Sequence, residues 1–174
     1  MDDNEPTHHE PDLWPAYLSY YREQVIDGVL ALNPERRRTS TVPSGWTPIE
    51  LLSHLVHMEQ RWFVWGFLGE HVEDVWGDWT VEDPWEQGEG SSGRWHVADD
   101  VSAESLAERL RALGRRTTEL LTTYPADAVA AEGERFEGDP ATLGWICFHV
   151  LQEYARHAGH LDVAVEIAGG HRGE

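Results

Sequence analysis

Three residues have the types and spacing of metal ligands. Glu153 and His157 are four residues apart in a segment of helical periodicity, which places both side chains on one helix face. Alone, such a pair is more typical of a helix salt bridge or a core histidine. His54 lies on the apolar stripe of another predicted helix and adds a third donor. Two imidazoles and a carboxylate suit a divalent transition metal, and three protein ligands leave the open positions typical of a catalytic site.

Three other histidines lie about one turn from the candidate ligands. His149 precedes Glu153 by four residues, and His57 and His160 follow the two candidate histidines by three. We expect these three to lie behind the ligands or on the surface, with His149 kept as an alternative ligand. The remaining histidines fall in predicted loops or tails, where solvent exposure is expected: His8, His9, His71, His96 and His171.

The other reactive side chains have ordinary structural interpretations. Cys147 lies on an apolar stripe with no basic group placed to lower its pKa, so we expect an inert core thiol. Arg61 and Arg156 are near the candidate ligands and suit an anionic substrate, but solvated ion pairs are the favoured interpretation. The glycine-rich tract near Gly88 lacks the lysine and the strand context of a phosphate-binding loop.

Hydrophobic periodicity predicts an all-α chain. The expected helices cover residues 13–32, a segment that starts at residue 48, residues 102–124 and residues 140–168. Short outer connections and a long middle one predict an antiparallel four-helix bundle with a long crossover loop between helices 2 and 3. In that loop, from residue 69 to residue 101, four tryptophans stand among acidic residues: Trp76, Trp79, Trp85 and Trp95. We expect this loop to form part of a substrate pocket.

Capping residues mark where the helices begin and end. Thr47 is expected to cap the second helix, with Pro48 at its first position and a glutamate three residues after the cap. Ser102 is expected to open the third helix. Asp139 is expected to cap the fourth helix, which should end at Gly169.

Length and charge limit the classes of protein and partner. A chain of 174 residues with 40% hydrophobic content predicts one domain, residues 12–170, between a flexible N-terminal tail, 1–11, and a C-terminal tail, 171–174. The formal charge of −19 argues against nucleic acid and anionic membranes as partners. We expect a cytoplasmic protein, because the acidic N-terminus does not resemble a secretory signal and no segment reaches the roughly 20 apolar residues of a membrane span.

Two segments together resemble a known family. They are GWTPIELLSHLVHMEQRW, residues 45–62, and FHVLQEYARHAGHLDVAVE, residues 148–166. Both are similar to the DinB-like metal-dependent four-helix family, and most to its branch with mycothiol-dependent maleylpyruvate isomerase and the mycothiol S-transferases. In that branch the ligands are a histidine on the second helix and a glutamate and a histidine on the fourth, which His54, Glu153 and His157 match. Other branches carry a histidine in place of Glu153, so the carboxylate favours the thiol-transferase branch.

This resemblance implies a metal-dependent transferase. The expected metal is zinc, with nickel, cobalt, manganese or iron as alternatives, and it would activate a low-molecular-weight thiol as a metal-bound thiolate for transfer to an electrophile or for thiol-assisted isomerisation. That the thiol is mycothiol rests on the resemblance. The alternatives are a non-catalytic metal-binding or stress-response protein and a metal-dependent hydrolase. The expected partners are a small-molecule thiol and an electrophile, with the chain a monomer or a homodimer.

Overall fold

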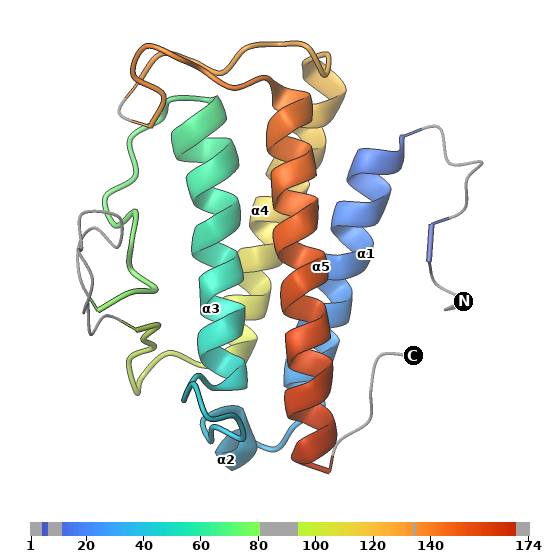
Figure 1. The fold of residues 1–174 in the computed structure, drawn as a ribbon, viewed down its shortest axis with the longest axis vertical. Helices are drawn as coiled ribbons and strands as arrows, with labels where there is room; N and C mark the ends of the chain where they lie inside the picture. Colours follow the sequence, from blue (N-terminus) through green and yellow to red (C-terminus); the bar gives the residue numbers. More distant parts are fainter. Residues whose placement is uncertain (1–4, 7–11, 81–93, 134, 170–174) are drawn as a thin grey trace.

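The fold is known from a computed structural model that describes residues 5–6, 12–80, 94–133 and 135–169 (Figure 1). The helices are α1 (Leu13–Leu30), α2 (Pro34–Arg37), α3 (Pro48–Glu59), the π-helical segment η1 (Gln60–Phe67), α4 (Ala103–Thr123) and α5 (Leu143–Ile167). Over these described ranges there are isolated bridges but no strand, which confirms the all-α prediction. No helix among them is long and apolar enough to cross a membrane.

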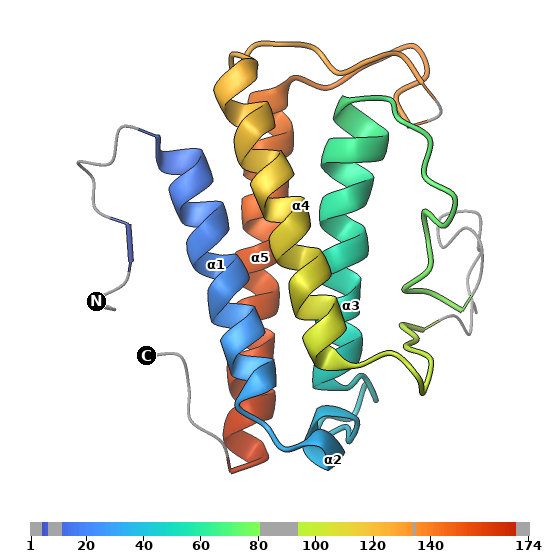
Figure 2. The same cartoon turned by 180° about the vertical axis from the view of Figure 1, so that it is seen from behind.

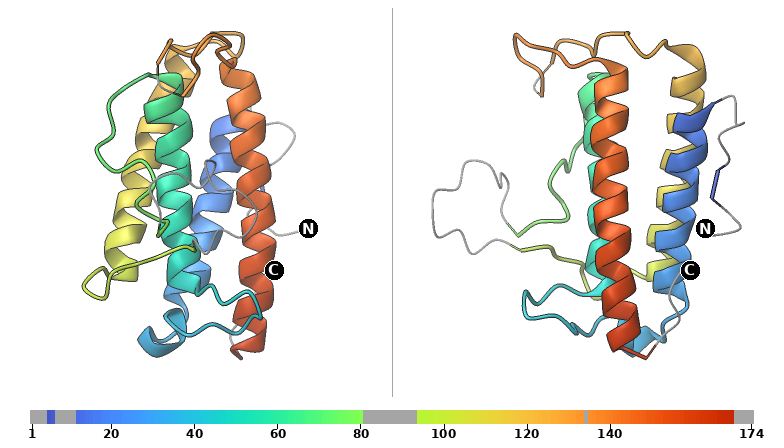
Figure 3. Two further views of the ribbon diagram at one scale, coloured as in Figure 1. Left: turned by 60° about the vertical axis from the view of Figure 1, so that its left-hand side comes forward. Right: turned by 45° about the vertical axis from the view of Figure 1, so that its right-hand side comes forward.

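The four long helices form the predicted bundle. α1 and α5 run in one direction, whereas α3 with η1 and α4 run in the other (Figures 1 and 2). α1 and α3 each pack against both α4 and α5. Because η1 and α4 run the same way, the connection between them must return along the bundle. Its described parts, residues 68–80 and 94–102, lie along the outer side of α3, away from α1 (Figure 3).

Two of the predicted caps are confirmed and one is wrong. Thr47 accepts a hydrogen bond from the backbone N–H of the residue three after it and forms the predicted capping box with that residue's side chain. Ser102 likewise accepts from the backbone of α4. The cap of α5, however, is Thr142 and not Asp139. The helix begins late because residues 141–142 are extended, and backbone hydrogen bonds of residues 141 and 143 to Ala130 and Ala128 hold them there.

Two local features differ from the prediction. α1 ends at Leu30 instead of residue 32, and Asn33 caps the short helix α2 where only turns were expected. The second long helix also changes geometry, since it continues from α3 as the π-helical segment η1. A π-helix has more residues in each turn than an α-helix and is often found at functional sites. It therefore changes which side chains of η1 face the crossover connection.

A buried carboxylate ties the four helices together. Glu59, at the end of α3, is fully buried, and Arg22 of α1 donates to both of its oxygens, at 2.8 and 3.1 Å. Thr117 of α4 donates to the same carboxylate at 2.6 Å, and the hydroxyl of Tyr154 on α5 donates to it at 2.5 Å. Gly114 of α4 makes room for Arg22, because a Cβ atom there would lie 2.5 Å from the guanidinium carbon. Each helix thus contributes one partner to a network that satisfies a buried charge.

Candidate metal centre

The three predicted ligands come together between α3 and α5. One ligand atom from each of His54, Glu153 and His157 lies within 4.8 Å of the other two. Helical spacing on α5 brings Nε2 of His157 to 3.2 Å from Oε2 of Glu153. The ring centroids of His54 and His157 are 4.9 Å apart across the helix interface. Packing of α3 on α5 therefore builds a donor cluster from residues about 100 positions apart in sequence.

Asp78 orients His54 from behind. Its Oδ2 lies 2.7 Å from Nδ1 of His54, and Arg61 donates to both of its carboxylate oxygens. Burial would raise the pKa of Asp78, but the hydrogen bonds from His54 and Arg61 outweigh it and hold that pKa at about 2. A carboxylate only accepts hydrogen bonds, so the Nδ1 of His54 carries the hydrogen. A neutral His54 consequently keeps Nε2 as the nitrogen with a free lone pair, which is the usual arrangement behind a metal-ligating histidine.

Backbone pairing in the crossover connection holds Asp78 in place. Thr80 N–H donates to the carbonyl of Arg94 at 3.0 Å, and His96 N–H donates to the carbonyl of Asp78 at 2.8 Å. The same pairing places Trp95 over the cluster. Its ring stacks on His54 with 4.3 Å between centroids and meets His157 edge-on at 5.4 Å. The aromatic cover keeps water from one side of the imidazoles, and burial accordingly lowers the pKa of His54.

The donor set fits a divalent transition metal ion. It offers two borderline nitrogen ligands and one hard oxygen, a combination suited to zinc and its neighbours. A hydrogen bond with His157 lowers the pKa of Glu153, which favours the charged, metal-binding form of the carboxylate. Nδ1 of His157 is buried and has no hydrogen-bond partner among the described residues. The site thus contains a ring nitrogen that no described protein group satisfies, as expected for a metal ligand. Metal binding itself stays a prediction.

A cavity of about 740 Å³ opens beside the candidate ligands. His54 and Glu153 form part of its wall. Aromatic side chains form much of the rest, from η1, from the crossover connection and from the connection before α5: Trp62, Trp76, Trp79, Trp95 and Phe136. Three of the four loop tryptophans expected at a pocket therefore line this cavity, whereas Trp85 is outside the described residues.

The histidines weighed as rivals take different positions. His149 lines the cavity and lies 4.0 Å from Glu153, but its ring stacks on Trp145 and it is not one of the three clustered ligands. His57 is buried, with Nδ1 2.9 Å from the carbonyl of Ser53, and His160 is exposed. His71 and His96 are exposed as expected, and His8, His9 and His171 are outside the described residues.

The solvated ion pair expected for Arg61 is wrong. Arg61 is buried and pairs with Asp78, and its guanidinium lies over the ring of Trp76 with 4.5 Å to the centroid. Arg156 is exposed. Nothing in its sequence context singled out Asp78, which lies 24 residues from His54 in a segment without periodicity. Its only distinctive local feature is its position between a glycine and a tryptophan, which by itself predicts no role.

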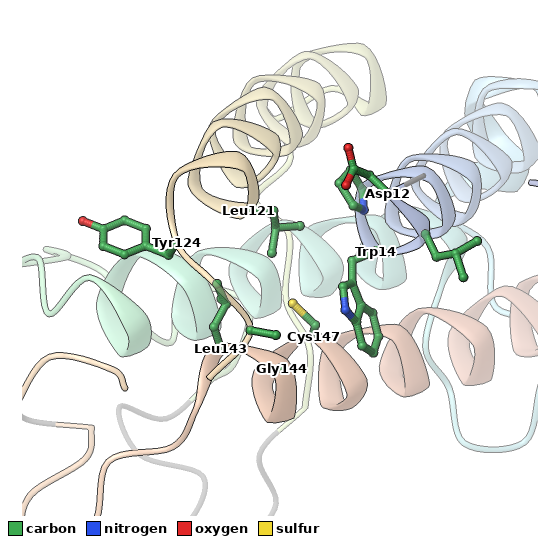
Figure 4. Close-up of a pocket in the computed structure, with 10 residues that line it drawn as sticks. Asp12, Trp14, Leu121, Tyr124, Leu143, Gly144 and Cys147 are labelled. Atoms are coloured by element: carbon green, nitrogen blue, oxygen red, sulfur yellow. The ribbon is translucent and has the colours of Figure 1, made fainter. Parts of the chain in front are cut away.

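Cys147 is a buried core residue, as expected, and it is not part of the candidate ligand cluster. It lies beside a second cavity of about 310 Å³, where Trp14 of α1, Leu121 of α4 and Leu143 of α5 also form the wall (Figure 4). Burial raises the pKa of its thiol to about 12. The thiol is therefore protonated at neutral pH and is a poor nucleophile.

Comparison with known proteins places this chain in a family. A crystal structure of a DinB-like protein from Bacillus cereus matches with a TM-score of 0.57 and 16% sequence identity, over 94% of this chain and 95% of that one. At this identity the likeness shows a shared fold, that of the DinB-like bundle proteins. The family model of the mycothiol S-transferases matches residues 14–170, and the chain belongs to that family. A search of curated proteins finds no match.

Proposed function

We propose that this protein transfers a low-molecular-weight thiol, mycothiol, to an electrophile, with a divalent ion held by His54, Glu153 and His157. The observation that carries the proposal is the position of the three-residue donor cluster: it borders a 740 Å³ cavity, and the residues that the structure describes add no fourth ligand to it. A closed tetrahedral site is typical of structural zinc, whereas an open one leaves room for a reacting ligand. Family membership supplies the identity of the thiol.

The protein's own residues bind, orient and shield. Glu153 and the two histidines would hold the ion, for which zinc is the expected metal. Asp78 fixes the ring of His54. When bound, such an ion supplies the positive charge that lowers the pKa of a coordinated thiol, so that its sulfur is a thiolate at neutral pH. Trp95 covers the imidazoles and limits the access of water.

The transfer step needs no reactant besides the thiol and the electrophile. The thiol sulfur forms a bond to an electrophilic carbon, and the bond from that carbon to its leaving group breaks, with the electron pair departing on the leaving group. The thiol proton passes to solvent. Thiol-assisted isomerisation uses the same attack, followed by departure of the same sulfur. Neither course requires a nucleophile from the protein, which agrees with the buried, protonated Cys147.

The test is a conjugation assay with mycothiol and 1-chloro-2,4-dinitrobenzene, in which a C–S bond forms and chloride leaves. We expect a rate above the uncatalysed background that is lost with a chelator, is restored by zinc and is higher with mycothiol than with glutathione. His54→Ala should lose the activity, whereas His71→Ala, at an exposed position, should keep it. Metal uptake without transfer to any of a broad panel of electrophiles would favour the binding protein, and thiol-independent ester cleavage would favour the hydrolase.

A further inference from the structure

Arg135 brings a second positive charge to the cavity. It lies in the connection between α4 and α5, yet its guanidinium packs on η1, with Cζ 4.0 Å from the ring centroid of Trp62 and 5.5 Å from that of Trp65. Gly66 of η1 allows this approach, because a Cβ atom there would be only 3.3 Å from Cδ of Arg135. Arg135 lines the same cavity as His54 and Glu153.

The charge of Arg135 has no acidic partner in the described part of the chain. No ion pair there includes it, and its Nε atom is buried with no hydrogen-bond partner among the described residues. By contrast, the two arginines that are buried among the described residues, Arg22 and Arg61, each pair with a buried carboxylate. Burial and the nearby charge of Arg61 lower the pKa of Arg135 to about 10, so it stays protonated at neutral pH.

An unpaired cation in a partly buried aromatic wall is costly unless a ligand supplies the opposite charge. A guanidinium presents parallel N–H donors that match the two oxygens of a carboxylate. Aromatic side chains of the same cavity, Trp62, Trp79 and Phe136, provide flat apolar surfaces for the remainder of a ligand.

We infer that Arg135 binds a carboxylate on the electrophile, and that the substrates are planar, apolar compounds carrying one carboxylate together with the electrophilic carbon. This inference rests on the proposed function, since it names the second substrate of that reaction. The carboxylate is assigned to the electrophile because mycothiol carries no carboxylate of its own. Arg135 would hold the anionic end of the substrate while the carbon to be attacked faces the metal-binding residues.

Binding can be tested apart from catalysis with two probes of the same shape, 4-nitrobenzoate and 4-nitrobenzamide. Both quench tryptophan fluorescence, and tryptophans line the cavity. Titrations are run with and without a chelator, because binding that survives removal of metal cannot be coordination of the carboxylate to an ion. We expect wild type to bind the benzoate about tenfold more tightly than the benzamide in both conditions, as one charge-assisted contact implies.

The variants separate recognition by Arg135 from a structural role. Arg135→Gln should weaken the benzoate about tenfold and leave the benzamide unchanged. Arg115→Gln, an equal change of charge at an exposed position on α4, should alter neither. Equal affinity for the two probes in wild type, or an equal loss of both in Arg135→Gln, overturns the inference.

A transfer assay distinguishes failure of this inference from failure of the proposed function. Metal-loaded protein is given mycothiol with 4-chloro-3-nitrobenzoate or 4-chloro-3-nitrobenzamide, and each rate is divided by its uncatalysed rate. We expect Arg135→Gln to raise KM for the benzoate alone. If wild type and Arg135→Gln transfer the thiol to both compounds at equal rates, the inference is overturned and the proposed function stands. Arg135-dependent binding of 4-nitrobenzoate without transfer overturns the function and supports the anion site.

Discussion

Nδ1 of His54 lies 2.7 Å from Oδ2 of Asp78, a residue that the crossover connection brings against the bundle from outside. Arg61 donates hydrogen bonds to the same carboxylate. The carboxylate that orients the ring of His54 is therefore itself fixed in position. The pair fixes both the orientation and the tautomer of the imidazole before any ligand arrives. Asp78 is thus a positioning residue whose effect on the cluster passes through His54.

Replacing Asp78 with asparagine should weaken metal binding by about 10- to 100-fold, the usual effect of losing a carboxylate behind a ligating histidine. Affinity is measured by competition with a chromophoric chelator. Asp100→Asn, at an exposed position in the same connection, is the matched control and should bind metal as wild type does. A purely structural role would lower the melting temperature of Asp78→Asn and leave the metal affinity of its folded fraction unchanged.

Glu59→Gln should destabilise the bundle strongly, because it leaves the guanidinium of Arg22 buried without its counter-charge. Loss of one partner from a buried pair costs about 3–5 kcal/mol. Urea unfolding gives the free energy directly. The pair between Arg111 and Glu23 is partly exposed, so Glu23→Gln serves as the comparison and should change stability by less than about 1 kcal/mol. Similar losses in both variants would contradict the importance of the buried network.

Two helical glycines should respond to alanine in opposite directions. A Cβ atom at Gly114 would lie 2.5–2.6 Å from the guanidinium of Arg22, so Gly114→Ala should lose about 1–3 kcal/mol through overpacking. Nothing lies within 4 Å of a Cβ atom built on Gly159 in α5. Gly159→Ala should therefore gain about 0.4–1 kcal/mol from the smaller backbone entropy of the unfolded chain. Thermal unfolding of the two variants compares them, and a stabilised Gly114→Ala would refute the tight packing.

Cys147 should resist alkylation in the folded protein. Because burial raises its pKa to about 12, the thiol stays almost fully protonated at pH 8, and its reactive thiolate fraction should grow steadily as the pH rises towards that value. Iodoacetamide labelling followed by intact mass spectrometry should show slow modification in buffer and rapid modification in guanidinium chloride. Cys147→Ala should retain thiol transfer, because the reacting sulfur comes from the cofactor. Fast labelling of folded protein would contradict the inert assignment.

Helical periodicity explains what the sequence could predict. The 3.6-residue repeat placed Glu153 and His157 on one face of one helix and His54 on the inner face of another, and the structure brings the three together. The capping box at Thr47 was also predictable, since its signal lies within four residues. These features depend on neighbours close in the chain, where spacing alone gives direction.

Features that depend on distant contacts were missed or wrong. Asp78 reaches His54 only because the backbone pairs residue 80 with residue 94 and residue 78 with residue 96, and no local pattern encodes that pairing. Arg61 is buried because it pairs with Asp78, which the same backbone pairing holds against the bundle. Glu59 is a charged residue of a type that is mostly exposed, and its burial depends on partners from three other helices. The late start of α5 likewise follows from pairing with residues 128–130.

The most direct test of the central claim is the initial rate of mycothiol transfer in protein stripped of metal and reloaded with zero to two equivalents of zinc per chain. Three converging ligands make one site, so the rate should rise in proportion to added zinc and become constant at about one equivalent. His157→Ala, treated in the same way, should show no rise near one equivalent. A rate in stripped wild type that equals the rate at one equivalent would contradict a metal-dependent thiol transferase built on His54, Glu153 and His157.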